Sequence, residues 1–155
     1  MQKISAGLLM YRIKNNNFEV FLVHPGGPYW KDKNEKTWNI PKGEVKEDED
    51  LFETAKREFE EETGIKIKRK KEDFTYIGEI KQKSGKIVHA WSFEGDWNGL
   101  LRQNIITMEF PYKSGKMIKI PEVDKAGFFK EEDAKKKLNS EQFELVERLK
   151  KIINY

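Results

Sequence analysis

The chain has 155 residues, which suits one folded domain and is too short to divide comfortably into two. Hydrophobic and charged residues each make up 37%, and the 12% aromatic content argues against a disordered chain. A net charge of +3 is too small to predict nucleic-acid binding by itself, and the absence of cysteine excludes a disulfide framework and a thiolate metal site. No apolar segment is long enough for a signal peptide or a membrane span, so we expect a cytoplasmic protein with no membrane partner.

The first half of the chain predicts a hairpin, a long loop and a helix. Residues 4–13 and 18–23 have the composition of strands, and three asparagines form the turn between them. The loop over 24–42 contains proline, glycine and several aromatic residues, and loops of this length are more often functional than not. Apolar residues at every fourth position then predict a helix over 50–63, which Gly64 ends.

The second half predicts a return to strands and a helical C-terminus. The expected strands are 74–81, 87–93 and 125–129, the expected helices are 133–138 and 140–153, and 94–116 is expected to be irregular. Strands that precede and follow a central helix predict an α+β fold in which a mixed β-sheet is covered by helices. No repeat or linker divides the chain, so we expect one domain over 1–155.

Three glutamates on the predicted helix, Glu58, Glu61 and Glu62, carry the strongest chemical signal. At 3.6 residues per turn their spacing places the carboxylates on an arc of about 100°, beside the apolar stripe and hence at the edge of the core. Like charges at this spacing repel one another, and the helix dipole disfavours them in the last turns. A divalent cation with oxygen ligands, Mg²⁺ or Mn²⁺, would offset the repulsion. For the triplet alone, a solvated charged face is the alternative.

The residues around the triplet separate these alternatives. Gly43, any five residues, Glu49, any seven residues and then Arg57 to Ile65 (Arg-Glu-Phe-Glu-Glu-Glu-Thr-Gly-Ile) match every specified position in the signature of the Nudix hydrolase family. The segment 43–65 therefore resembles the Nudix box. The preceding strands, the Pro-Lys-Gly lead-in and the last strand also resemble the family domain, more weakly, so the resemblance covers nearly the whole chain.

This resemblance implies a Nudix-type αβα sandwich that cleaves a nucleoside diphosphate linked to another moiety, by attack of water on a phosphorus. It implies that Glu61 and Glu62 are the principal metal ligands, and that Glu58 either ligates metal or acts as general base. Arg57 matches a family residue that orients a glutamate, whereas Glu49 is expected to be a structural anchor. The catalytic candidates are therefore Glu58, Arg57 and Glu61.

Two further metal ligands are implied from outside the helix. The backbone carbonyl of Lys42 matches a position that is often a ligand in the family. Many relatives also add a carboxylate shortly before the final strand, where this chain has Glu122, with Asp124 and Glu109 as fallbacks. The candidate metal set is Glu58, Glu61, Glu62, Lys42 and Glu122.

Candidate substrate-binding residues come from the loops. The Lys42 ammonium could contact a phosphate, with a solvated loop lysine as the alternative. His24 ends a strand that leads into the loop, so it either faces the substrate or is a surface histidine. Tyr112, like Tyr29 and Trp30, lies in an irregular segment where an exposed ring could stack on a base, the alternative being a place in the core.

The leading functional hypothesis is magnesium-dependent hydrolysis of a nucleoside polyphosphate. The short chain and the Pro-Lys-Gly lead-in resemble relatives that act on dinucleoside polyphosphates such as diadenosine tetraphosphate. The alternatives are a nucleoside triphosphate or RNA 5′-end pyrophosphohydrolase, and a non-catalytic nucleotide-binding Nudix sensor. We expect a small nucleotide as the partner, with no nucleic acid other than an RNA 5′ end, and the sequence leaves the oligomeric state open. Substrate choice is expected in the loops at 24–42 and 94–120.

Overall fold

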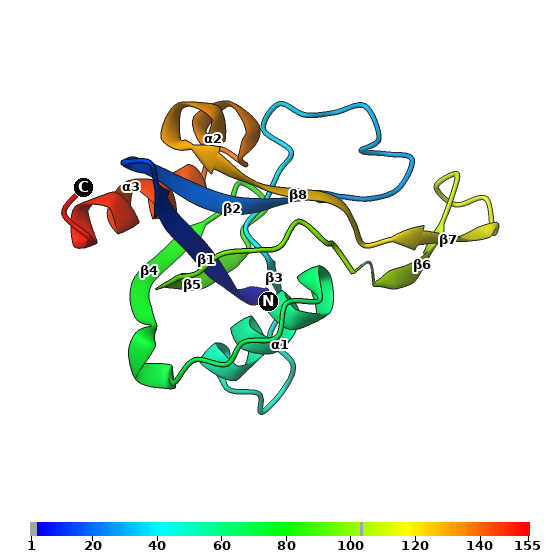
Figure 1. Cartoon of the computed structure of the whole chain (residues 1–155). Helices are drawn as coiled ribbons and strands as arrows, with labels where there is room; N and C mark the ends of the chain where they lie inside the picture. The colour runs from blue at the N-terminus through cyan, green and yellow to red at the C-terminus, as the bar shows by residue number, and fades with distance from the viewer. Residues whose placement is uncertain (1–2, 103) are drawn as a thin grey trace.

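A mixed six-stranded sheet lies at the centre of the computed structural model, which describes residues 3–102 and 104–155 (Figure 1). The elements follow one another as β1 (Ile4–Lys14), β2 (Asn17–Pro25), β3 (Lys42–Glu44), α1 (Leu51–Thr63), the 3-10 helix η1 (Lys71–Asp73), β4 (Thr75–Lys81), β5 (Ile87–Glu94), β6 (Ile105–Glu109), β7 (Met117–Pro121), β8 (Val123–Lys130), α2 (Glu131–Lys137) and α3 (Phe143–Ile152). Within the described residues, no helix is long and apolar enough to cross a membrane.

Strand β1 organises the sheet, whose order is β4-β5-β1-β2-β8 with β3 as an additional partner of β1. Along one edge of β1, the first half pairs with β3 (Gly7 opposite Lys42) and the second half pairs with β2 (Tyr11 opposite Val20), both antiparallel. Along the other edge, β1 runs parallel to β5. The predicted mixed sheet is therefore confirmed, and this pairing fixes Lys42 and Gly43 beside the middle of the sheet.

Helices cover both faces of the sheet. Successive side chains of the central strands point to opposite faces, and each face has its own hydrophobic core. On β1, Leu8 and Met10 join a cluster with Phe52, Ala55 and Phe59 of α1. Leu9, which points to the opposite face, belongs to a second cluster with residues of α2 and α3. Figure 1 shows α1 on one side of the sheet and α2 and α3 on the other. The predicted α+β sandwich is confirmed.

Helix α1 begins and ends where the sequence predicts. The Asp50 side chain accepts a hydrogen bond from the Glu53 backbone N–H at 3.0 Å, which caps the first turn. Gly64 adopts a left-handed φ of 75°, and its N–H donates to the carbonyl of Glu60. The glutamates of the last turns are thereby held on a rigid element.

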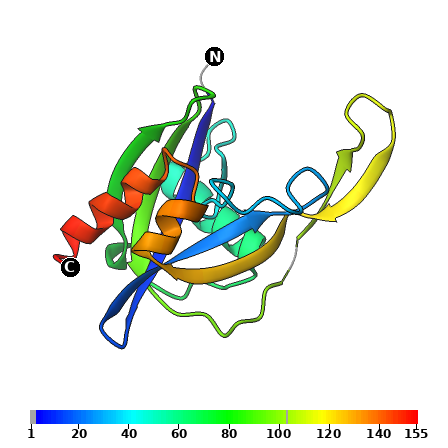
Figure 2. The ribbon, with the colours of Figure 1, turned by 90° about the horizontal axis from the view of Figure 1, so that it is seen from above.

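The segment 94–116 is only partly irregular, so that prediction is wrong in part. Strands β6 and β7 pair antiparallel, with Glu109 opposite Met117, and form a two-stranded sheet separate from the main one. This hairpin projects away from the body of the protein (Figure 2). Helix α3 also begins three residues later than predicted, at Phe143. The hairpin leads directly into β8 through Glu122.

Candidate active site

Glu58 is fixed by the close approach of β3 to helix α1. A Cβ atom at Gly43 would lie 2.0 Å from the Glu58 carboxyl carbon, so only glycine leaves room for this side chain. Gly43 is held there by its pairing with Ala6 of β1. The Glu58 side chain is 13% exposed. The backbone of the lead-in therefore forms one wall around this carboxylate.

Glu62 lies one turn further along α1 and is only 6% exposed. Burial raises the pKa of its carboxyl well above the usual range, and the charges of Glu122 and Glu58 raise it further. The nearby Lys42 opposes this shift through its charge and its backbone. The pKa of Glu58 is also raised, chiefly by burial, although the neighbouring Arg57 lowers it. A site with surplus negative charge thus lies at the end of α1.

Glu122, between β7 and β8, completes this group. Its charge raises the pKa of both Glu58 and Glu62, so the three carboxylates lie within electrostatic range of one another. Its backbone carbonyl accepts from the Gly26 N–H at 3.0 Å, its own N–H donates to the Asn104 carbonyl at 2.8 Å, and the Asn104 side chain donates to its carboxylate. The structure therefore brings together Glu58, Glu62 and Glu122.

The two fallback carboxylates are engaged elsewhere. Asp124 contacts the ring of His24. Glu109 accepts from the backbone N–H groups of Lys113 and Gly115, each at 2.9 Å, and so closes the turn of the β6–β7 hairpin. Of the three carboxylates considered before the final strand, the structure brings Glu122 to the glutamates of α1.

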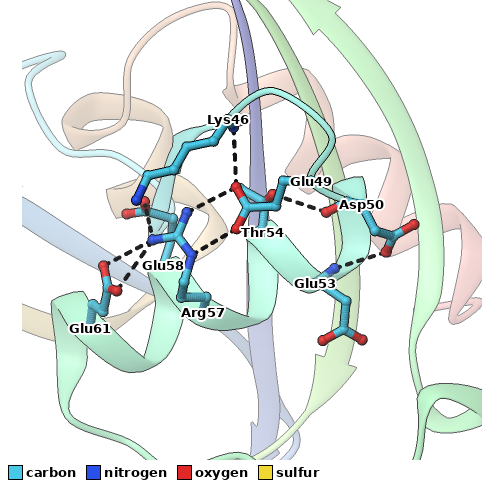
Figure 3. A network of polar contacts seen from close by, with 8 residues as sticks. All are labelled: Lys46, Glu49, Asp50, Glu53, Thr54, Arg57, Glu58 and Glu61. Carbon is cyan, nitrogen blue, oxygen red and sulfur yellow. Dashed lines mark hydrogen bonds and ion pairs between the residues drawn. The ribbon is translucent and has the colours of Figure 1, made fainter.

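Arg57 connects the glutamates of the box (Figure 3). Its guanidinium donates two hydrogen bonds to Glu49, at 2.9 and 3.1 Å, and further ones to Glu58 at 3.0 Å and Glu61 at 3.2 Å. These bonds to Arg57, above all, lower the pKa of the Glu49 carboxyl to about 2. Glu49 anchors Arg57, which in turn orients Glu58.

Glu61 lies further from the core than Glu58 and Glu62. Its side chain is 47% exposed, and its two oxygens each accept from Arg57 at 3.2 Å. The expectation that all three carboxylates lie at the edge of the core therefore holds for Glu58 and Glu62, whereas Glu61 lies on the solvent side of Arg57. Its two hydrogen bonds with Arg57 hold it on that side.

Lys42 lies partly buried beside the carboxylates. Burial lowers the pKa of its ammonium, as does the charge of Lys86, while Glu62, Glu58 and Glu44 raise it. Its ammonium is thus within the field of the two α1 glutamates that face the core. The solvated loop lysine considered as an alternative does not fit this burial.

The donor set of this site suits a hard cation. Every candidate side-chain donor is a carboxylate oxygen, and such oxygens are the ligands that Mg²⁺ and Mn²⁺ prefer. Buried like charges also favour the uptake of positive charge. Within residues 3–102 and 104–155, no three histidine or acidic side chains converge on one point, and both Glu58 and Glu61 accept hydrogen bonds from Arg57. The residue types, carboxylates held at the edge of the core, fit a divalent metal.

His24 is buried, so the prediction of a surface histidine is wrong. It is 0% exposed, and its Nε2 donates to the Lys33 carbonyl at 2.5 Å while Nδ1 lies 2.7 Å from the Asp124 carboxylate. The ring lies near the end of strand β2 and packs beside Trp38, at 5.3 Å between ring centroids. Both ring nitrogens have partners within the protein.

Tyr112 lies at the far end of the β6–β7 hairpin and is 75% exposed. The hairpin register runs from Ile105 opposite Pro121 to Glu109 opposite Met117. At the usual rise per residue, these four steps carry the tip about 13 Å from the strand ends beside Glu122. The structure therefore does not bring Tyr112 to the carboxylates.

A model of the NUDIX domain family matches residues 1–149 of this sequence. The chain belongs to this family. Nudix hydrolase 7 of Arabidopsis thaliana is 42% identical over 62 residues, which is 40% of this chain and 21% of that protein, so the matched stretch spans about a fifth of the relative. Nudix hydrolase 5 of the same plant is 42% identical over 53 residues, 34% of this chain and 17% of that protein.

Solved Nudix structures share the fold of this Nudix chain. An Ap4A hydrolase from C. elegans, in a binary complex, aligns with a TM-score of 0.67 and 22% identity over 98% of both chains. The NUDIX domain of Shewanella oneidensis NrtR, complexed with ADP ribose, aligns with a TM-score of 0.65 and 15% identity over 99% of this chain and 89% of that one. At these identities the likeness concerns the fold.

Two residues that support the site carry no local sequence signal. Asn104 binds both the backbone and the carboxylate of Glu122. Gly26 passes so close to β7 that a Cβ atom on it would lie 1.9 Å from the Pro121 carbonyl oxygen. Both act on a partner more than fifteen residues away, and only the arrangement of the hairpin reveals them.

Proposed function

We propose that this Nudix chain is a magnesium-dependent pyrophosphohydrolase that cleaves a phosphoanhydride bond in a nucleoside polyphosphate. The observation that carries the proposal is the gathering of Glu58, Glu62 and Glu122 at the edge of the core, where burial and mutual repulsion raise the pKa of the first two. Stability alone does not favour such an arrangement, since like charges are brought together away from water. A function that requires a bound cation accounts for it.

The metal-binding residues in this proposal are Glu58, Glu61, Glu62 and Glu122, together with the backbone carbonyl of Lys42. When bound, Mg²⁺ or alternatively Mn²⁺ would offset the negative charge that develops on a phosphate and lower the pKa of an attacking water. The Lys42 ammonium would contact a phosphate oxygen, as a point charge in the field of Glu58 and Glu62.

Glu58 is the proposed general base or ligand, and Arg57 is the residue that orients it. A raised pKa lies closer to the neutral pH at which the enzyme would work, and it makes the Glu58 carboxylate a better proton acceptor. The Arg57 guanidinium holds one Glu58 oxygen at 3.0 Å and is itself held by Glu49. This chain of contacts fixes the carboxylate before substrate arrives.

The proposed substrate is a dinucleoside polyphosphate such as diadenosine tetraphosphate. The Pro-Lys-Gly lead-in and the shared fold with an Ap4A hydrolase over nearly the whole chain support this class. A nucleoside triphosphate and an RNA 5′ end are the alternative substrates, and a non-catalytic nucleotide sensor is the alternative function. The absence of cysteine fits a cytoplasmic setting.

The test is hydrolysis of a substrate panel in the presence of Mg²⁺. The panel comprises diadenosine tetraphosphate, ATP, ADP ribose and 5′-triphosphorylated RNA, and products are separated by ion-exchange chromatography. Glu61→Gln and Glu62→Gln are the active-site variants. Glu53→Gln is the matched control, because it removes the same charge from the exposed first turn of the same helix.

We expect diadenosine tetraphosphate to be hydrolysed fastest, with strong loss in both active-site variants and none in Glu53→Gln. If the protein binds nucleotides but hydrolyses none of them, the proposal of an enzyme is wrong and the non-catalytic sensor is the function. Equal activity of Glu62→Gln and the wild type would contradict the metal assignment.

A further inference from the structure

A loop over residues 25–37, here called the Trp30 loop, is attached to the backbone of Glu122. The Gly26 N–H donates to the Glu122 carbonyl at 3.0 Å. The lack of a side chain at Gly26 is what permits this contact, because a Cβ atom there would lie 1.9 Å from the Pro121 carbonyl oxygen. The loop therefore starts directly beside a proposed metal ligand.

The buried His24 holds the same loop at a second point. Its Nε2 donates to the Lys33 carbonyl, and its Nδ1 lies against Asp124 of β8, two residues after Glu122. Between the two attachments, the Trp30 N–H donates to the Gly27 carbonyl at 3.2 Å and the Lys33 N–H donates to the Trp30 carbonyl at 3.0 Å. Trp30 thus lies on a pair of consecutive turns that are clamped to β8.

The β6–β7 hairpin supports the loop from the side. The rings of Tyr29 and Phe110 meet edge to face, 5.2 Å apart between centroids. Figures 1 and 2 both show the loop between β2 and β3 beside the hairpin. The two segments in which we expected substrate choice therefore pack against each other at the end of the sheet that carries Glu122.

The Trp30 ring is 41% exposed, whereas Trp38 is buried and Trp91 and Trp97 are partly buried. The Lys33 ammonium lies 5.5 Å from the ring centroid of Trp30, within the range of a cation–π contact. A turn closed between residues i and i+3 spans at most about 7 Å between Cα atoms, so Trp30 lies within about 11 Å of Gly26. A nucleotide that carries two or three phosphates spans such a separation.

We propose that Trp30 is the residue on which a nucleobase of the substrate stacks, with the phosphate chain directed toward Glu58, Glu62 and Glu122. The proposal rests on the proposed function for the nature of the substrate. Lys33 places a positive charge over one face of the ring, which leaves the other face for the base and puts a cation near its phosphate chain. His24 and Gly26 are positioning residues, since they act through the loop that carries Trp30.

The test measures binding separately from hydrolysis. Isothermal titration calorimetry with Mg²⁺ uses two non-hydrolysable probes, the analogue of ATP in which both bridging oxygens of the phosphate chain are replaced by methylene, and the base-free methylenediphosphonate. The variants are Trp30→Ala and Trp30→Phe. Tyr76→Ala is the control, because it removes an exposed ring from β4, at the edge of the sheet opposite β8.

We expect Trp30→Ala to weaken binding of the nucleotide analogue about tenfold or more, because the variant loses the stacking of one base on an aromatic ring. Trp30→Phe should stay within about threefold of the wild type because it keeps an aromatic face. Both Trp30 variants should bind methylenediphosphonate as the wild type does. The Tyr76→Ala variant should bind both probes as the wild type does.

Three results would overturn the proposal. These are unaltered nucleotide binding by Trp30→Ala, an equal loss for both probes, and no binding of the analogue by the wild type. The hydrolysis panel separates this proposal from the proposed function. Loss of stacking in a protein that hydrolyses nothing would refute the function alone, while hydrolysis with unaltered binding by Trp30→Ala would refute the stacking alone.

Discussion

Helix α1 and the Trp30 loop differ in how their positions are determined. The carboxylates of α1 are placed by helical spacing and by one close approach, of Gly43 to Glu58. The Trp30 loop is placed by contacts with β7, β8 and the hairpin, from residues about a hundred positions away in the chain. The carboxylates of α1 are thus encoded locally, whereas Glu122 and the proposed recognition of the substrate depend on tertiary packing.

Glu62→Gln tests the local side of the comparison and should have the largest effect. We expect the rate of hydrolysis to fall at least about 10²–10³-fold. A loss of this size is typical when one group that stabilises charge in the transition state is removed. The same variant should make the metal-free protein more stable at pH 7.5, by about 2–4 °C in Tm if the gain is about 1 kcal/mol. Hydrolysis assays and thermal unfolding in a chelator measure the two effects.

The pH dependence of this gain follows from the raised pKa of Glu62. The folded protein holds the Glu62 proton more tightly than the unfolded chain does, so the stability of the wild type falls as pH rises above 4.5. The Tm values of wild type and variant should therefore be close below pH 4.5 and separate above it. A Glu62→Gln protein that is less stable than the wild type at pH 7.5 would contradict the electrostatic account.

Gly43→Ala tests the close approach of β3 to α1. The added methyl group meets the Glu58 carboxyl at 2.0 Å, so the carboxylate must move. A displacement of about 1 Å can cost about 10² in rate, and we expect a loss of that order in kcat. Gly127→Ala on β8 is the matched control, since its nearest neighbour lies at an ordinary contact distance of 3.4 Å. Equal rates for the two variants would show that this approach is not required.

Glu49→Gln tests the anchor of Arg57. We expect kcat to fall about tenfold, which is the smaller end of the loss seen when a residue that orients a metal ligand is removed. The pKa of Glu49 is lowered from 4.5 to about 2, so its ionised form contributes stability above pH 4.5 that is lost as pH falls toward 2. The variant should have the lower Tm at pH 7, and the difference should vanish near pH 2. A difference independent of pH would point to lost packing instead of lost charge.

Tyr112→Ala should have the smallest effect. This ring lies at the hairpin tip, far along the strands from Glu122, and is mostly exposed. We expect less than about a twofold change in kcat or KM, as for other surface substitutions. A much larger rise in KM would mean that the whole hairpin, and not only its base, contacts the substrate.

The elements that local patterns specify could be predicted from the sequence. Asp50 and Gly64 bound α1 as expected, and β1, β2, β4, β5 and β8 lie close to their predicted positions, whereas β3 was not predicted as a strand. The resemblance to the Nudix family predicts Glu122 through its spacing from the last strand, and its charge raises the pKa of Glu58 and Glu62.

The remaining features depend on partners that sequence patterns do not identify. Strands β6 and β7 pair with each other, outside the main sheet. The proline and glycine between them are typical of irregular segments, so the sequence did not predict these strands. His24 is buried because Asp124, a hundred residues later, lies within 2.7 Å of its ring. Glu61 belongs to the same triplet as Glu62, yet Arg57 holds it on the solvent side.

The central claim is that the carboxylates of α1 and Glu122 hold a divalent cation. Electron paramagnetic resonance of Mn²⁺ titrated into the protein counts free and bound metal without any substrate. We predict binding by the wild type and by Glu53→Gln, and at least about tenfold weaker binding by Glu62→Gln and by Glu122→Gln. Equal Mn²⁺ affinity in all four proteins would contradict the account.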